Sequence, residues 1–210
     1  MHHFNVVQTS PQGEVCTAKG GVFTDQYSTE RLTVIALDVD ELKLYMDDYD
    51  GFKLKMNISS QRDSIDKEFR YLFNIALKKI IKKPELRFWL TPWIIVLNSD
   101  QTIVGNICFK GAPDFNRTVE IGYDVDELYW NNGIATEALI GMIEHTPELG
   151  RVKYIKAETE WDNLPSQAVL RKCGMVRYKY GQGSIWWRMK LIQSFNLIKR
   201  NNEFNDRKRM

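Results

Sequence analysis

The sequence predicts a mixed α/β domain of the α+β kind, with a mostly antiparallel central sheet flanked by helices. Short apolar runs rich in β-branched residues follow one another between residues 93 and 125, and strands joined by short loops are typical of an antiparallel meander. Amphipathic segments with a helical period lie before and after those runs. The chain has 210 residues, enough to bury a full hydrophobic core without a disulfide or a metal ion.

The first third of the domain predicts one strand and two helices. The run LTVIAL at 32–37 reads as a strand, and 38–48 reads as a short helix with a single apolar face. A longer helix follows, for which Asp63 or Ser64 is the expected N-cap and Pro84 the expected end. Its expected apolar face consists of Ile65, Phe69, Leu72, Phe73, Ala76 and Ile80.

The rest of the chain predicts the meander, followed by two helices and three further strands. The expected elements are strands 93–97, 103–109 and 118–125, a helix beginning near Ala135, a strand at 152–159, a helix at 164–173, and two closing strands near 175–180 and 184–191. Helices between the later strands imply a crossover, so the sheet is expected to be mixed and to carry helices on both faces.

Composition excludes several classes of protein. The formal net charge is +2, too small for the basic field of a dedicated nucleic-acid binder. The 3 cysteines are widely spaced, which argues against a disulfide framework or a zinc site. No apolar run approaches the ~20 residues of a membrane helix, and no signal peptide is visible. We therefore expect a cytoplasmic protein without a nucleic-acid, membrane or metal partner.

Two segments carry the chemical signal, and each joins an expected strand to an expected helix. The first is YWNNGIATEAL at 129–139, where Gly133 and Ala135 leave the helix N-terminus accessible. Such a terminus presents free N–H groups and the positive end of the helix dipole, so it can bind phosphate. The second is WDNLPSQAVLRKCGM at 161–175, in which Asn163 suits an N-cap. Taken singly, each also fits an ordinary, well-capped connection.

Taken together, the two segments resemble the paired signature of the GNAT acyl-CoA N-acyltransferase superfamily, in particular its RimJ/RimL-like branch. The resemblance extends to STERL at 28–32, VGNI at 104–107, FKGAP at 109–113 and VEIGY at 119–123, in the family's order. It implies the GNAT fold, with acetyl-CoA in a cleft between splayed strands. Those strands would be 118–125 and 152–159.

The resemblance also implies which residues contact acetyl-CoA. In the family the pyrophosphate lies on the loop before the helix, and a backbone N–H near Val125 polarises the thioester carbonyl. The expected contacts are Tyr123, Asp124, Val125, Trp130, Asn131, Asn132, Gly133, Ile134, Ala135, Thr136, Asn163 and Ser166. Two departures stand out. Asn131-Asn132 replaces a common Gly-Lys pair, and Arg171 stands where many members have an acid-donating tyrosine.

The reaction itself needs a base, because an alkylammonium must lose a proton before its nitrogen can attack. Glu120 aligns with a glutamate typical of this branch and is the first candidate, acting directly or through water. Glu158 and Glu160 on the opposite strand are rivals, since alternate strand residues share a face. Ser166 is expected to contact or protonate the leaving thiol. Each of these side chains also has a purely structural interpretation, as a surface carboxylate or a helix cap.

The implied function is acetyl transfer from acetyl-CoA to a primary amine, on a small molecule or a peptide N-terminus. The alternative is a GNAT-like module that binds acetyl-CoA or a peptide without catalysis. The expected organisation is an N-terminal arm (1–27), an N-acetyltransferase domain (28–192) and a basic C-terminal tail (193–210). The chain is expected to be a monomer or a homodimer.

Overall fold

A computed structural model of the chain describes residues 17–18, 21–22, 25–145 and 152–191. The expected basic tail at 193–210 and most of the expected arm at 1–27 lie outside these ranges. Two short strands, β1 (Thr17–Ala18) and β2 (Gly21–Val22), pair with each other. The main sheet begins at β3 (Gln26–Ser28), whose Tyr27 is buried in the core.

The main sheet is mixed and mostly antiparallel, as predicted. Its order is β10-β11-β9-β8-β7-β6-β4-β3, with β5 paired to β7 off this path. In this part of the chain only β8–β9 and β5–β7 are parallel pairs. The strands are β4 (Leu32–Ala36), β5 (Ser59–Ser60), β6 (Trp93–Leu97), β7 (Thr102–Phe109), β8 (Thr118–Val125), β9 (Tyr154–Glu160), β10 (Val176–Tyr180) and β11 (Ser184–Lys190).

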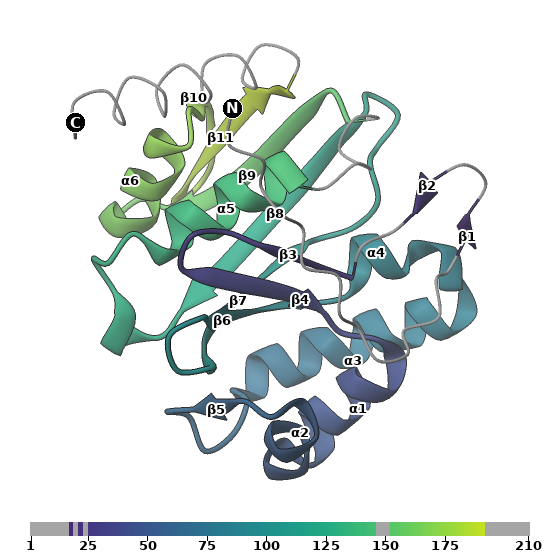
Figure 1. The fold of residues 1–210 in the computed structure, drawn as a ribbon. Helices are drawn as coiled ribbons and strands as arrows, with labels where there is room; N and C mark the ends of the chain where they lie inside the picture. The colour runs from purple at the N-terminus through teal and green to yellow at the C-terminus, as the bar shows by residue number, and fades with distance from the viewer. Residues whose placement is uncertain (1–16, 19–20, 23–24, 146–151, 192–210) are drawn as a thin grey trace, which may run out of the picture.

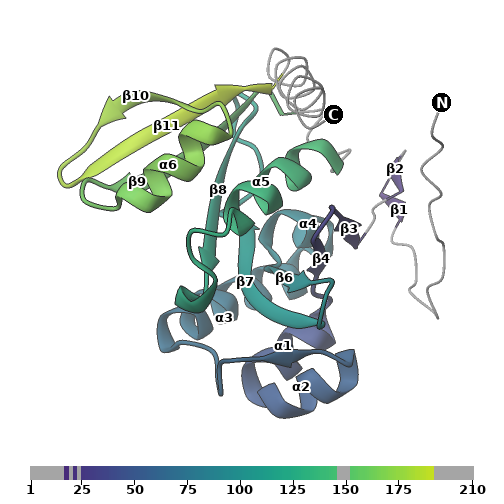
Figure 2. The same cartoon turned by 60° about the vertical axis from the view of Figure 1, so that its left-hand side comes forward.

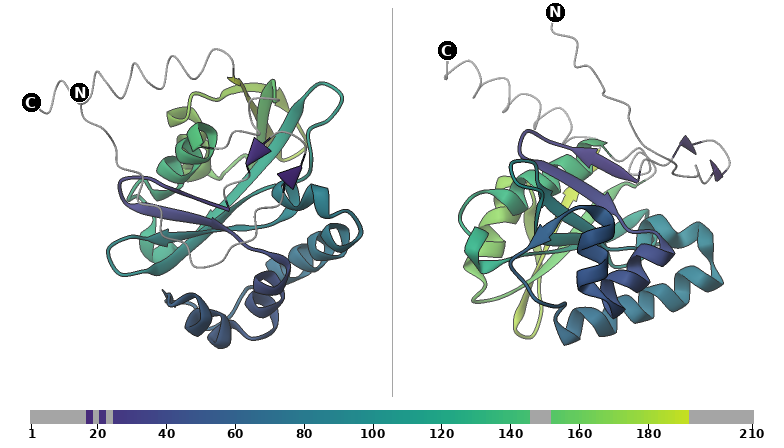
Figure 3. Two further views of the ribbon diagram at one scale, coloured as in Figure 1. Left: turned by 45° about the vertical axis from the view of Figure 1, so that its right-hand side comes forward. Right: turned by 60° about the horizontal axis from the view of Figure 1, so that its bottom comes forward.

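The helices lie on both faces of the sheet, as predicted (Figure 1). Beside β4–β7 lie α1 (Val39–Asp47), α2 (Tyr49–Met56), α3 (Lys67–Lys82), α4 (Arg87–Leu90) and the 3-10 turn η1 (Pro84–Leu86). The helix α5 (Ile134–His145), which follows the 3-10 turn η2 (Glu127–Tyr129), packs against β3, β4 and β8, and α6 (Leu164–Lys172) packs against β9. Figure 3 shows α1, α2 and α3 gathered away from α5 and α6.

Each group of helices has its own apolar core against the sheet. The core under α5 and α6 joins Leu139, Met142 and Leu170 to strand residues such as Ile155. The core under α1–α3 joins residues such as Phe52 and others of those helices to Ile94, Val96 and Ile103 of the sheet. Most of the predicted helices and strands therefore form because each has an apolar face to bury, whereas β10 is exposed along its whole length. Of the helices described, none is long and apolar enough to cross a membrane.

Details of α3 correct the sequence-based expectation. The predicted N-caps, Asp63 and Ser64, are wrong: α3 begins after Asp66, whose side chain accepts a hydrogen bond of 2.7 Å from Glu68 N. Leu72, expected on the buried face, is 49% exposed, because the helix buries Phe73, Leu77 and Ile80 instead. One apolar edge of α3 consequently faces solvent. The helix α2 was not predicted, since Gly51 and its lysines hide the helical period.

Candidate active site

The central feature of the site is a splay between β8 and β9. The two strands pair in parallel only from Thr118↔Tyr154 to Glu120↔Lys156, although β8 continues to Val125 and β9 to Glu160. Figure 2 shows them separating beyond that point. The two strands expected at 118–125 and 152–159 therefore separate after Glu120 and Lys156, with β9 observed at Tyr154–Glu160.

The edge of β8 that faces the splay offers backbone donors. On the other edge, Lys110 N donates to Glu120 O and Asp126 N donates to Val104 O, both at 2.9 Å. Residues of an antiparallel strand alternate between hydrogen-bonded and non-hydrogen-bonded pairs. The N–H groups of Tyr123 and Val125 consequently point away from β7, toward the splay. This is the orientation that the expected polarisation of a thioester by Val125 requires.

The loop before α5 is shaped by left-handed backbone conformations. Asn131 has φ +61° and Gly133 has φ +78°, a region that glycine adopts freely and asparagine tolerates. The first helical hydrogen bond runs from Glu137 N to Gly133 O. The N–H groups of Ile134, Ala135 and Thr136 therefore have no acceptor within the helix. The expected phosphate loop thus presents three backbone donors at the positive end of α5.

Trp130 and Asn132 support this loop with their side chains. Trp130 Nε1 donates to Val125 O at 2.6 Å, and Asn132 Nδ2 donates to Trp130 O at 3.0 Å. Asn131 and Asn132 themselves are exposed. The loop is therefore tied to the end of β8, and its asparagines leave the approach to α5 free of a positive side chain of their own.

A clamp between the first strands and α5 was missed by the sequence analysis. Glu137 accepts hydrogen bonds from Thr29 Oγ1 at 2.5 Å, Arg31 N at 2.9 Å and Arg31 Nε at 2.7 Å. Arg31 also donates to Asn132 O at 3.0 Å. Burial opposes ionisation of Glu137, but these bonds outweigh it and lower its pKa. Thr29 and Arg31 belong to the STERL segment and Glu137 to YWNNGIATEAL, so the presence of both segments was the signal in the sequence that could have indicated this contact.

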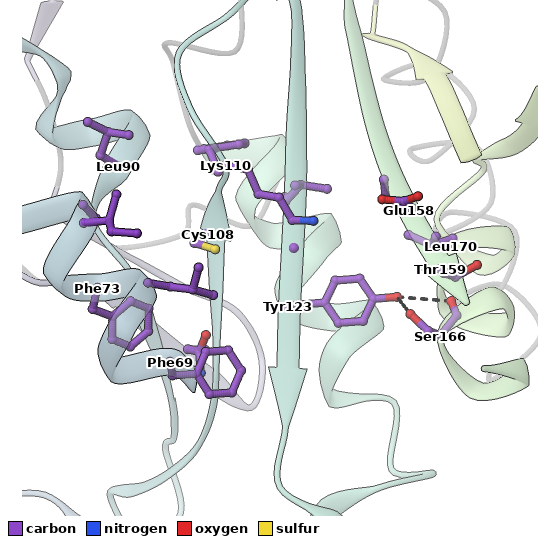
Figure 4. A pocket seen from close by; sticks show the side chains of 18 of the residues that line it. Phe69, Phe73, Leu90, Cys108, Lys110, Tyr123, Glu158, Thr159, Ser166 and Leu170 are labelled. Atoms are coloured by element: carbon purple, nitrogen blue, oxygen red, sulfur yellow. Dashed lines mark hydrogen bonds between the residues drawn. The ribbon is translucent and has the colours of Figure 1, made fainter. Parts of the chain in front are cut away.

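Ser166 is held at both ends of the residue. Asn163, the N-cap of α6, accepts a bond of 3.0 Å from Ser166 N, so the capping interpretation of Asn163 is confirmed. The Ser166 hydroxyl lies 2.8 Å from the hydroxyl of Tyr123, which reaches across from β8 (Figure 4). Arg171, at the position of the family's tyrosine, instead donates to Gln167 O at 3.3 Å.

A pocket of about 560 Å³ passes from α3 across β7 and β8 to β9 and α6. Its α3 wall is mostly apolar and includes Phe69, Leu72 and Ile75, whereas its β9 wall carries Glu158 and Glu160. The remaining lining residues are Phe73, Ala76, Lys79, Leu90, Asn106, Cys108, Phe109, Lys110, Ile121, Gly122, Tyr123, Ala157, Thr159, Asn163, Ser166 and Leu170. In Figure 4 the side chains of Glu158, Lys110 and Tyr123 approach the pocket from three different strands.

Glu120 lies at the closed end of the splay and does not line this pocket. Its carboxylate forms ion pairs with Lys110 Nζ at 2.9 Å and Lys156 Nζ at 3.0 Å. Burial opposes ionisation of this carboxyl, but the hydrogen bonds from the two lysines outweigh it and hold the pKa of Glu120 below its usual range. A carboxylate stabilised in this way is a weakened base.

Asp124 was expected to contact acetyl-CoA, and its side chain is occupied elsewhere. Arg62 Nη2 lies 2.9 Å from Asp124 Oδ2 and also contacts Asp126. Burial raises the pKa of Asp126, although Arg62 offsets part of that effect. The side chain of Asp124 is therefore engaged by Arg62, and the alternation that turns Tyr123 and Val125 toward the splay turns the backbone of Asp124 toward β7. Within the described ranges, no group of three or more His, Cys, Asp or Glu side chains could hold a metal ion.

Comparison with known proteins finds relatives that are named as N-acetyltransferases. The chain is 37% identical over 84 residues to the uncharacterized N-acetyltransferase YjdG of Bacillus subtilis, covering 40% of this chain and half of that protein. It is 29% identical over 181 residues to the uncharacterized N-acetyltransferase p20 of Bacillus licheniformis, covering 82% of this chain and 95% of that protein.

Solved structures share the fold, including that of RimJ of Mycobacterium smegmatis in complex with CoA-disulfide. Its TM-score is 0.55 at 16% identity, over 81% of this chain and 89% of that one. The sequence itself matches the family described as "Acetyltransferase (GNAT) domain" over residues 36–176. That stretch includes β8, β9, α6 and the loop at 130–133 before α5, which we call the phosphate-type loop. The chain belongs to the GNAT acetyltransferase family.

Proposed function

We propose that this protein transfers an acetyl group from acetyl-CoA to a primary amine, on a small molecule or a peptide N-terminus. The observation that carries the proposal is the splay between β8 and β9. Backbone donors line the splay near α5, and a pocket with carboxylates opens from it toward α3. The site therefore offers one side for an anionic cofactor and another for an amine.

The donor set fits acetyl-CoA. The free N–H groups of Ile134, Ala135 and Thr136 would hold the pyrophosphate, with Asn131 and Asn132 beside them. The N–H groups of Tyr123 and Val125 face the splay, where they would bind the amide groups and thioester carbonyl of the donor. Trp130 fixes the loop against Val125 O. Acetyl-CoA supplies the activated acetyl group as a thioester.

The proton of the amine needs a carboxylate within the pocket. Glu158 and Glu160 both line the pocket, and we assign Glu158 the task of accepting that proton, directly or through water, with Glu160 as its rival. Glu120 as the base stays a prediction, and comparing Glu120→Gln with Glu158→Gln would test it. In the transfer, the nitrogen lone pair forms the N–C bond, the C–S bond breaks with its electron pair on sulfur, and the amine proton passes to the carboxylate. Val125 N–H would stabilise the charge developing on the carbonyl oxygen.

The test is acceptor-dependent release of thiol from acetyl-CoA. The purified chain should be incubated with acetyl-CoA and a panel of small amines and peptides with free N-termini, and the products identified by mass. We expect thiol release to match acetylated acceptor in equal amounts. Binding of acetyl-CoA without release for any acceptor would overturn the proposal and favour a non-catalytic module.

A further inference from the structure

We propose that Tyr123 is a positioning residue for the leaving sulfur, and that it acts by fixing the direction in which the Ser166 hydroxyl donates. This inference rests on the proposed function, because it assigns a donor to the sulfur of the acyl carrier. It goes beyond that function in giving a role to a side chain that the expected contacts place only near the cofactor.

The geometry links two elements that meet only at the pocket. Tyr123 comes from the middle of β8, and Ser166 comes from the first turn of α6. The phenol oxygen lies 2.8 Å from Ser166 Oγ and 3.1 Å from Ser166 O. Both residues are partly buried, and both line the pocket. The bond closes the gap between β8 and α6 at the side where the splay is open (Figure 4).

The phenol of Tyr123 donates to Ser166 O, and in its contact with Ser166 Oγ either hydroxyl can be the donor; we take the phenol as that donor. Burial raises the pKa of its phenol, and the hydrogen bond with Ser166 offsets only part of that shift. The phenol therefore keeps its proton across the working pH range, and both of its neighbours at Ser166 can accept that proton. When the phenol donates to Oγ, the hydrogen of Ser166 must point away from Tyr123. Asn163 fixes the backbone of Ser166, so few directions remain.

A donor at this place matches what the leaving group needs. A thiol has a pKa of about 8.5, so the sulfur can leave as a thiolate near neutral pH, provided that a hydrogen bond stabilises its charge. Ser166 would donate this hydrogen bond and retain its proton. The thiolate then takes a proton from water, and Tyr123 remains a phenol throughout. No residue on this side of the pocket has to be reprotonated between turnovers.

The closing experiment measures binding, so that it does not depend on the acceptor. Affinities of coenzyme A and its desulfo analogue should be compared by calorimetry at pH 7 and pH 9. The variants are Tyr123→Phe, Ser166→Ala and the double variant. Tyr178→Phe on β10 is the control, since it also removes a phenol hydroxyl, from a tyrosine that is exposed and lies outside the pocket lining. All these changes are conservative, so melting curves should show folded protein.

We expect wild type to bind coenzyme A about tenfold more tightly than the desulfo analogue at pH 9, and less so at pH 7, because the bond to a thiolate is charge-assisted. Each single variant should lose most of this preference. The double variant should lose no more, since both changes act on the same hydrogen bond from Ser166 to the sulfur. The Tyr178→Phe control should keep it.

Three results would overturn the inference. Wild type could bind the two ligands equally, Tyr123→Phe could keep the preference that Ser166→Ala loses, or the two losses could add. A wild-type protein that binds neither ligand would instead contradict the proposed function, and with it this inference. Kinetics give a second readout: both single variants should lower kcat about equally, with the KM of the acceptor unchanged.

Discussion

The splay has two sides that present different kinds of chemical group: a cofactor side near α5 and α6, and an acceptor side near α3. The side near α5 and α6 presents mainly backbone N–H groups, held in place by hydrogen bonds such as those of Glu137, Trp130 and Asn163. The side near α3 presents side chains: an exposed apolar helix edge, two glutamates of β9, and the Lys110–Glu120–Lys156 cluster. In the proposed function, the first side would recognise a chemical group common to all acyl-CoA donors. The second side can differ from one protein to another without disturbing the first.

Replacing Glu158 on the acceptor side should give the largest effect. Glu158→Gln keeps the size of the side chain and removes its basicity, so turnover should fall about 10²–10⁴-fold, the usual contribution of a general base. Acetyl-CoA affinity should persist. The loss should shrink as pH rises toward the pKa of the acceptor, near ~8 for an α-amine or ~10 for a lysine-like amine. Steady-state rates between pH 6 and 10 measure this.

Glu120→Gln is the matched control for that experiment. It removes a carboxylate that stabilises Lys110 and Lys156 at the closed end of the splay, so we expect a smaller loss of turnover without rescue at high pH. If Glu120→Gln shows the large pH-rescued defect and Glu158→Gln does not, the base is Glu120, as the family resemblance implies. A defect in neither would point to Glu160, and the absence of a defect in Glu160→Gln as well would leave the proton to water.

The clamp on the cofactor side should give the next largest effect, on stability. Glu137→Gln weakens three hydrogen bonds to a charged carboxylate, which should lower the free energy of unfolding by about 1–3 kcal/mol at pH 7. Because folding lowers the pKa of Glu137, its contribution is present above the unfolded value of about 4.3. It should be lost as pH falls from there through the lower folded value.

Urea unfolding of both proteins at pH 7 and at several values below 4 measures this difference. Glu144→Gln, near the other end of α5, is a suitable control, because it changes the same group on the same helix. Equal destabilisation by both variants, or a difference that persists at low pH, would contradict the clamp.

The cofactor side was largely predictable because its features are local. Spacing alone placed Gly133 before a helix and Asn163 at a cap, and the structure shows both there. Strand bounds within the meander were also close, since each strand carries a continuous apolar face. The exact cap of α3 was missed because Asp63, Ser64 and Asp66 are all good cap residues, and tertiary packing chooses among them.

The acceptor side was less predictable because its features depend on tertiary contacts. Glu120 and Glu158 lie on different strands, and only the fold decides that two lysines neutralise Glu120 while Glu158 faces the pocket. The link between Tyr123 and Ser166 likewise joins residues 43 positions apart. Nothing in the local sequence of either residue indicates such a pair.

A charge placed on the phosphate-type loop should weaken acetyl-CoA binding about tenfold. Asn131→Asp is nearly isosteric and suits the left-handed backbone at φ +61°, but its carboxylate would repel a pyrophosphate. Asn131→Gly keeps the backbone conformation and removes the side chain, so it should bind acetyl-CoA about as well as wild type. Acetyl-CoA at ~100 times its Kd should raise the melting temperature of wild type by roughly 5–10 °C.

Equal binding by Asn131→Asp and wild type would place the pyrophosphate elsewhere. A loss in Asn131→Gly as large as that in Asn131→Asp would show that the amide side chain is an essential ligand. Either result would weaken the contrast between a backbone-built side and a side-chain-built side.

The smallest expected effect lies on the exposed edge of α3, where an apolar side chain can serve the acceptor without serving the fold. Leu72 lines the pocket and is 49% exposed, whereas Ile81 on the same helix is 57% exposed and lies outside the pocket lining. Glutamine preserves helix propensity at either position. Leu72→Gln should therefore raise the KM of acceptors with an apolar substituent a few-fold, in proportion to the ~1 kcal/mol or less of apolar contact that it removes. Ile81→Gln should leave that KM unchanged, and neither change should alter acetyl-CoA affinity, because backbone groups on the opposite side of the splay provide it.

Measuring KM over a series of amines with substituents of increasing apolar area makes the effect specific: the ratio between the KM of Leu72→Gln and that of wild type should grow along the series. A constant ratio, or the same change in Ile81→Gln, would mean that this edge of α3 does not contact the acceptor.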